Sequence, residues 1–215
     1  MKKILLTIVA VLFSFTQAHA ENMSEGFRLG ISASATEVNG SGSETMRTTK
    51  KQSAVATTSE DTTIGHVFAE KTFSNGFTLG VDYVPGEADV GTKSRADDDI
   101  ESAGGNKASA VVSEHLTFYG LMPMGSSPLY IKAGIISMEV ETNEVLNTGS
   151  KYGDATVNGV TAGIGAHFER DSGLFVRAEY SMSEYEDIRL TSDGDNIVEA
   201  DIDTTAMKLS IGKSF

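Results

Sequence analysis

The final stretch of this 215-residue chain, residues 204–215, reads as a β-strand with one apolar face. Successive strand side chains point to opposite faces of a sheet, so Met207, Leu209, Ile211 and Phe215 share one side. The other side carries only small or polar residues and a lysine. An exposed Phe215 at the end of an edge strand would be a liability in a soluble sheet. The pattern predicts a strand that pairs on both sides and turns its apolar face toward an apolar medium.

Residues 1–20 have the composition of a secretory signal peptide. Two lysines come first, residues 4–15 form an apolar run, and Ala18-His19-Ala20 has the small residues of a cleavage site. The run is too short for a membrane-spanning helix, which needs about 20 apolar residues. We therefore expect cleavage after Ala20, leaving residues 21–215 as a single domain.

The composition excludes several classes of protein. The chain has 17 basic and 30 acidic residues, a net charge of −13, and residues 1–20 contain two of the lysines and no acidic residue. Such an acidic chain would be repelled by nucleic acid phosphates, so we expect no nucleic acid partner. The chain has no cysteine, which excludes disulfides and a lipid-attached cysteine.

Seven further segments have the alternation of β-strands. They are residues 27–36, 62–73, 77–83, 108–122, 129–135, 160–168 and 174–182. In 62–73 the better register puts Val67, Ala69, Lys71 and Phe73 outside, with Lys71 reaching the membrane edge. The facing of 108–122 stays open, although placing Glu114 inside is the less costly choice.

Connections of two kinds join these segments. Long polar stretches cover residues 37–61, 87–107, 141–154 and 183–203, whereas short turns cover 74–76, 123–128 and 169–173. Long connections at one end and short turns at the other are typical of outer-membrane barrels, whose long loops are extracellular and whose turns are periplasmic. The predicted fold is all-β, an antiparallel up-and-down transmembrane β-barrel of about eight strands.

Several short motifs are similar to those of a known family. They are Asn75-Gly76, Tyr83-Val-Pro-Gly86, Leu129-Tyr-Ile-Lys-Ala-Gly134, Phe175-Val-Arg-Ala-Glu-Tyr180 and Leu209-Ser-Ile-Gly-Lys-Ser-Phe215. With the strand pattern, the chain resembles the small eight-stranded outer-membrane barrels, namely the OmpA transmembrane domain and the OmpX and opacity-protein group. The resemblance covers essentially all of residues 21–215. It implies a location in the cell outer membrane, with outer-membrane lipid and lipopolysaccharide as surroundings, and a monomer.

The same resemblance gives the C-terminal strand a role in assembly. Leu209, Ile211 and Phe215 resemble the terminal signal that the barrel-assembly machinery recognises. The expected partners during biogenesis are therefore this machinery and periplasmic chaperones.

The predicted inner faces carry charges of both signs. This set comprises Arg28, Glu70, Asp82, Glu114, Lys132, Arg177, Glu179 and Lys208. An interior of about eight strands is just filled by side chains, and isolated buried ions cost several kcal/mol. We expect a plug of ion pairs, with a gated polar pathway for small solutes as the alternative.

Catalysis and metal binding have weaker support. Ser113-Glu114-His115 supplies the residue types of a hydrolase, but Glu114 would point to the opposite face from the other two, and His167 has no evident nucleophile. Residues 193–203 are rich in acidic side chains but lack the spacing of a calcium loop. Phe73, Phe77, Tyr83, Phe168 and Phe215 are expected as interface anchors.

We therefore expect a non-enzymatic barrel without cofactor or metal, with a structural, surface or adhesion role through its loops. The alternatives are a narrow porin-like channel, a transporter of small hydrophobic molecules and, more remotely, a lipid-modifying hydrolase.

Overall fold

The computed structural model describes residues 23–45, 55–95, 106–145 and 151–215. The predicted signal peptide of residues 1–20 therefore lies outside the described residues. The strands are β1 (Gly26–Thr45), β2 (Ala56–Thr72), β3 (Thr78–Tyr83), β4 (Ala88–Arg95), β5 (Asn106–Pro123), β6 (Leu129–Val145), β7 (Ala155–Glu169), β8 (Leu174–Tyr185), β9 (Ile188–Thr191) and β10 (Ile197–Ser214). Among the described residues, no helix is long and apolar enough to cross a bilayer.

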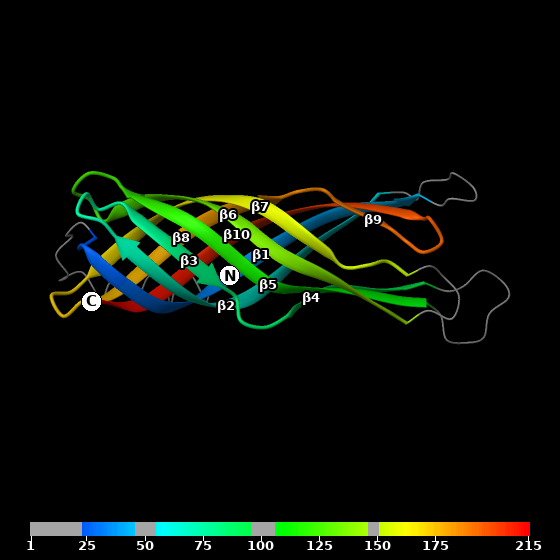
Figure 1. Cartoon of the computed structure of the whole chain (residues 1–215), viewed down its shortest axis with the longest axis horizontal. Coiled ribbons are helices and arrows are strands. Elements are labelled where there is room, and N and C mark those ends of the chain that lie inside the picture. Colours follow the sequence, from blue (N-terminus) through cyan, green and yellow to red (C-terminus); the bar gives the residue numbers. More distant parts are fainter. Residues whose placement is uncertain (1–22, 46–54, 96–105, 146–150) are drawn as a thin grey trace.

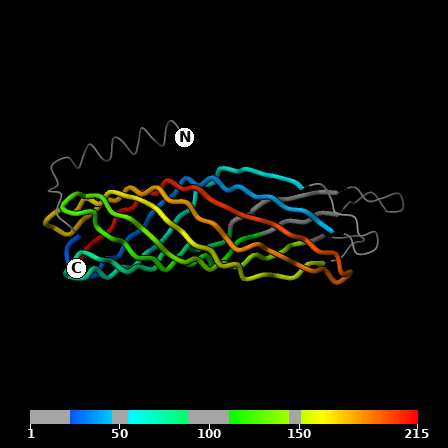
Figure 2. The backbone as a smooth tube through the Cα atoms, turned by 90° about the horizontal axis from the view of Figure 1, so that it is seen from above, coloured from blue at the N-terminus to red at the C-terminus, as the bar shows by residue number. Residues whose placement is uncertain are grey.

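The strands close into an elongated barrel (Figure 1). All neighbours are antiparallel, and β1 pairs with β10 along its length. The segments β3 and β4 both border β5, and β8 and β9 both border β10, so each couple is one interrupted strand. With that pairing the barrel has eight strands, as the sequence predicted. Figure 2 shows the strands crossing the long axis obliquely, as closure of a barrel requires.

The two ends of the barrel differ. Tight turns and the C-terminus form one end, which we call the turn end, at the left of Figure 1. Gly76 and Gly173, with φ of 79° and 76°, supply the left-handed residues of two turns there. The hairpin of β9 and β10 and the far ends of β1, β5 and β6 lie at the opposite end, which we call the loop end.

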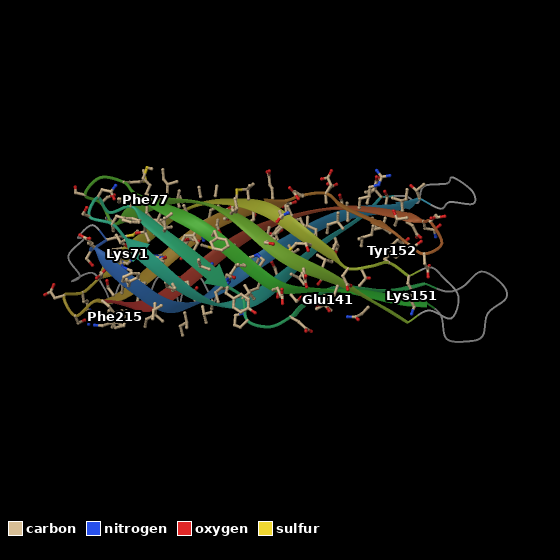
Figure 3. All side chains as sticks on the ribbon, viewed as in Figure 1. Lys71, Phe77, Glu141, Lys151, Tyr152 and Phe215 are labelled. Carbon is tan, nitrogen blue, oxygen red and sulfur yellow. The ribbon has the colours of Figure 1, made fainter. Side chains whose placement is uncertain are left out.

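Closure at the turn end uses the C-terminal strand. Phe27 and Phe215 exchange two backbone hydrogen bonds, at 3.1 and 2.8 Å. Figure 3 shows Phe215, Phe77 and Lys71 at the turn end, and the Lys71 ammonium lies 4.4 Å from the centroid of the Phe27 ring. This aromatic rim agrees with the predicted anchors.

Side-chain burial is inverted relative to a soluble protein. Arg28, Lys132 and Arg177 are buried, whereas large apolar side chains cover the outside. This apolar belt comprises Phe27, Leu29, Ile31, Val67, Phe73, Leu79, Tyr83, Phe118, Met122, Leu129, Ile131, Ile135, Val160, Ile164, Leu174, Tyr180, Met182, Met207, Ile211 and Phe215. A continuous exposed belt of this kind fits the hydrocarbon of a membrane.

The strands continue past the apolar belt toward the loop end. β1 has 20 residues, about twice the 9–11 that a transmembrane strand needs. The prediction of loops over residues 37–61, 87–107 and 183–203 is therefore wrong in their length. Much of each range is β-strand, formed by β1, β2, β4, β5, β9 and β10. No residue of β1 beyond Glu37 or of β2 before Ile64 is buried, so backbone pairing continues there without any alternation in hydrophobicity.

A β-bulge explains why the facing of 108–122 could not be predicted. The register shifts between Ser113 and Leu116, where Glu114 has a φ of 51°. Val112 packs against the inner apolar cluster before the bulge, and Thr117 is buried in the lumen after it. The extra residue switches the inward positions from even to odd numbers.

The backbone pairing around the barrel is interrupted between β2 and β4. Pairing of β2 with β3 runs from Thr72–Thr78 to Val67–Tyr83. Beyond that point, no backbone ladder joins β4 to β2 in the described part of the chain. This unpaired stretch of β2 begins at the loop-end edge of the apolar belt, next to Val67 and Tyr83.

Candidate functional site in the barrel lumen

The lumen contains four cation–carboxylate pairs. Seven of the eight predicted inward charges lie in the lumen, and the structure adds Glu169. The pairs are Arg28–Glu169 at 3.1 Å, Arg177–Glu70 at 2.6 Å, Lys132–Glu179 at 2.7 Å and Lys208–Asp82 at 2.9 Å. Each positive side chain thus has its own carboxylate, so these eight groups balance.

The Arg177–Glu70 pair joins β8 to β2 across the lumen. Both terminal nitrogens of Arg177 donate to Glu70, at 2.6 and 2.8 Å, which is the strong two-pronged geometry. Tyr119 adds a third hydrogen bond to Glu70 at 2.6 Å. The rings of Phe68, Tyr130 and Phe175 surround the guanidinium, with centroids 5.4–5.6 Å away. Charge pairing and aromatic packing together fill this level of the lumen.

A second pair lies beside it on β6 and β8. Lys132 donates to Glu179 at 2.7 Å, and the Tyr130 hydroxyl donates to the other oxygen of Glu179 at 2.9 Å. The Lys132 ammonium also lies 4.7 Å from the centroid of the Tyr119 ring. The two tyrosines therefore link the carboxylates to the aromatic packing around Arg177.

At the turn end, Arg28 is fully buried and pairs with Glu169. Arg28 also hydrogen-bonds to Thr72, and His167 contacts Glu169 at 3.1 Å. The sequence placed residue 169 in a turn, so Glu169 was missed. Its side chain reaches back into the mouth of the lumen, which no alternation pattern could indicate.

Glu114 was predicted to belong to this network, and that prediction is wrong. Glu114 is exposed at the bulge of β5, on the side away from the other charges. The alternation rule assumes an unbroken strand, and the inserted residue turns Glu114 outward.

Glycines on the inner face leave space for the aromatic side chains that fill part of the lumen. In four cross-strand pairs a glycine faces an inward aromatic residue: Gly30–Phe68, Gly80–Tyr119, Gly165–Tyr130 and Gly212–Phe175. A Cβ on Gly165 would lie 2.2 Å from the Tyr130 hydroxyl oxygen. The glycines therefore leave space for rings that lie flat against the inner wall.

This packing predicts that Gly165→Ala lowers the free energy of unfolding by about 1–3 kcal/mol, the usual cost of overpacking. The added methyl displaces Tyr130 and weakens its bond to Glu179. Urea unfolding in lipid vesicles measures the change. Gly153→Ala is the control, because no atom lies within 4 Å of its Cβ position. Equal stability of both variants would contradict the role of the glycine.

A chain of hydrogen bonds crosses β1, β2 and β3. The His66 Nδ1 lies 2.7 Å from Asp82 Oδ1, and His66 Nε2 lies 3.0 Å from Ser34 Oγ. Asp82 also accepts from Lys208, and Ser34 contacts the Thr36 hydroxyl at 3.0 Å. Asp82 was among the predicted inward charges, whereas Ser34 and His66 were missed, although both have the parity of inward positions on their strands.

The histidines considered in the sequence have other neighbours. His115 Nε2 lies 3.3 Å from the Tyr185 hydroxyl, and Ser113 donates to Glu141. Ser113, Glu114 and His115 thus do not form a nucleophile–base arrangement.

A cavity of about 180 Å³ lies on the loop-end side of the Lys208–Asp82 pair. Apolar side chains line part of its wall, among them Ile64, Ile136 and Met138. Ser34, His66 and Asp82 line it as well. The cluster of Met138, Val140, Val157 and Ile188 packs farther toward the loop end. The cavity therefore lies between the ion pairs and an apolar cluster.

Acidic side chains are exposed around the loop end. Examples are Glu37, Glu139, Glu184, Asp187 and Asp203. A hydrogen bond with Asp201 raises the pKa of the exposed Asp187 carboxyl. In the described ranges, no group of three or more potential ligand side chains could hold a metal ion.

The three residues of the predicted assembly signal lie on the closing strand β10. Ile211 and Phe215 are exposed on the outer face, and Leu209 is half-buried between Ala33 and Ala178 of the neighbouring strands. Their placement agrees with the predicted outer face, and their part in assembly stays a prediction.

Several solved structures match the backbone of this chain. Neisserial surface protein A matches with 11% identity and a TM-score of 0.44, over 88% of this chain and 97% of that chain. OprG from Pseudomonas aeruginosa matches with 10% identity and a TM-score of 0.49, over 91% and 99%. The Escherichia coli outer membrane protease OmpT matches with 8% identity and a TM-score of 0.49, over 91% and 100%. No curated protein sequence matches the chain.

The sequence itself identifies the family. The Outer membrane protein beta-barrel domain matches residues 6–215, which is nearly the whole chain. With the inverted burial and the closed eight-stranded barrel, the chain belongs to the outer membrane protein beta-barrel domain family.

Proposed function

We propose that this outer-membrane barrel is a structural and surface protein whose lumen is closed to ions. The observation that carries the proposal is the set of four ion pairs with its Arg177–Glu70 centre. Each of the four cations is held by a carboxylate, and aromatic rings fill the space around Arg177. A passing ion would have to separate such a pair, which is costly in a narrow interior.

The loop end supplies the surface for outside contacts. The Tyr152 hydroxyl donates to Glu44 at 2.9 Å, and the Lys151 amide donates to Asp193 at 3.0 Å. These bonds tie the β6–β7 connection to β1 and to the β9–β10 hairpin. Figure 3 shows Glu141, Lys151 and Tyr152 at this end, far from Phe215. A polar and acidic surface whose connections are held together by hydrogen bonds supports a surface or adhesion role.

The position of the apolar belt and of β10 in the barrel suggests the remaining partners. The belt would contact outer-membrane lipid and lipopolysaccharide as a monomer, and β10 would engage the barrel-assembly machinery after delivery by periplasmic chaperones. The exposed Ile211 and Phe215 support this last step.

Thiol labelling of intact cells tests the location and orientation. The chain has no cysteine, so single-cysteine variants give a clean signal. Gly194→Cys at the loop end is expected to react with a membrane-impermeant maleimide in intact cells. Ser74→Cys in the opposite turn is the matched control and should react only after permeabilisation. The reverse pattern, or recovery of the protein in the soluble periplasm, would contradict the proposal.

A further inference from the structure

Hydrogen bonds connect Ser34, His66 and Asp82 in a series that ion pairing in the lumen does not require. The three residues come from adjacent strands and share the inner face, with exposures of 2%, 8% and 3%. In the register, Ser32 faces His66 and Phe68 faces Asp82, so His66 lies diagonally between Ser34 and Asp82. The wall of the barrel therefore holds the imidazole between a hydroxyl and a carboxylate.

The hydrogen-bond partners of His66 agree with a neutral imidazole that can act as a base. Asp82 accepts from the Lys208 ammonium at 2.9 Å, so it is the ionised acceptor in its 2.7 Å contact with His66 Nδ1. In the neutral tautomer with the proton on Nδ1, the Nε2 of His66 accepts from the Ser34 hydroxyl 3.0 Å away. Nucleophile, base and orienting carboxylate are thus in the order that serine hydrolases use.

These groups lie where a ligand could reach them. All three line the cavity of about 180 Å³, and an apolar cavity of about 150 Å³ is enough for a molecule of benzene size. Ser32, the neighbouring inward serine on β1, is not among the residues that line it. Ile64 of β2 and Val84, which directly follows β3, line the same cavity. The cavity therefore borders the part of the barrel where β2 and β4 are not paired.

We propose that this cavity is an esterase site for esters with a small apolar acyl group, with Ser34 as nucleophile and His66 as general base. Asp82 is a positioning residue that holds the imidazole. The stretch where β2 is not paired with β4 begins at the edge of the apolar belt and would be the route by which apolar esters enter from the outer boundary of the membrane. This proposal departs from the sequence-based prediction that the protein is not an enzyme.

The reaction balances with water as co-reactant. Ser34 Oγ attacks the carbonyl carbon while its proton passes to His66 Nε2, and the ester C–O bond breaks as the alcohol takes that proton. Water then attacks the acyl group on Ser34, giving its proton to His66. His66 returns this proton to Ser34 Oγ as the carboxylic acid leaves. Lys132 and Lys208 line the cavity and would offset the negative charge on the tetrahedral oxygen.

Labelling with a short-chain alkyl fluorophosphonate tests the nucleophile. The full chain, folded in detergent micelles, is expected to be modified on Ser34, as mapped by peptide mass spectrometry. Ser34→Ala should remain unlabelled, whereas Ser32→Ala, the matched control, should be labelled like wild type. The shift in gel mobility between unheated and heated samples confirms that each variant is folded.

Hydrolysis of p-nitrophenyl butyrate provides the second readout. The wild type is expected to exceed Ser34→Ala and His66→Gln by about a hundredfold or more in kcat. Asp82→Asn should lower kcat with little change in KM, and Asp82→Glu should restore part of it. If folded wild type leaves Ser34 unlabelled and hydrolyses no faster than Ser34→Ala, the proposal is wrong. The three residues would then only fill the lumen, and the ion-pair plug would be unaffected.

Discussion

Arg177→Ala is expected to lower the free energy of unfolding by about 3–5 kcal/mol, because it leaves Glu70 as an unpaired buried charge. Arg177 makes two hydrogen bonds to Glu70 and lies among three aromatic rings. The void would also admit water, so the variant should pass more ions than wild type. Urea unfolding in lipid vesicles and bilayer conductance measure the two effects.

A double-mutant cycle with Glu70→Leu provides the control for this prediction. Glu70→Leu alone should also destabilise, since it leaves the Arg177 guanidinium without its carboxylate. The double variant Arg177→Ala/Glu70→Leu should lose much less than the sum of the two single losses, because no unpaired buried charge remains. Additive losses in the double variant would mean that the two residues are not coupled.

Leu209→Arg is expected to block stable insertion, at a cost of about 2–4 kcal/mol for a cation near the middle of the bilayer. Leu209 lies on the outer face of β10, between Met207 and Ile211. Ser210→Ala changes the next residue, which is buried in the lumen, and should have little effect. The fraction of protein that migrates as a folded barrel without heating measures insertion. Similar losses in both variants would contradict the assigned faces.

The transmembrane half of the fold could be predicted because each strand faces lipid on one side and the lumen on the other. That environment enforces alternation, which identified inward residues such as Arg28 and Arg177. Beyond the belt no residue of the outer part of β1 is buried, so that part carried no such signal. The bulge at Glu114 could not be predicted either, because one inserted residue inverts the alternation without changing the composition.

The contacts between side chains inside the lumen could not be predicted from alternation. Alternation shows which residues point inward, but the register and the stagger of the strands decide which of them meet. Ser34, His66 and Asp82 come from three strands, and a long connection separates β1 from β2. Only the pairing of Ser32 with His66, and of Phe68 with Asp82, brings the three together. Glu169 could not be assigned because its role depends on a side chain that turns back from a strand end.

Single-channel recording in planar lipid bilayers tests most directly the claim that ion pairs close the lumen. With four cation–carboxylate pairs intact, wild type is expected to show little or no steady conductance, and Arg177→Ala is expected to show more. The unheated, folded form of each protein is inserted at equal amounts, with Ser210→Ala as the control. A large and steady conductance of wild type would contradict the closed lumen and favour a narrow channel.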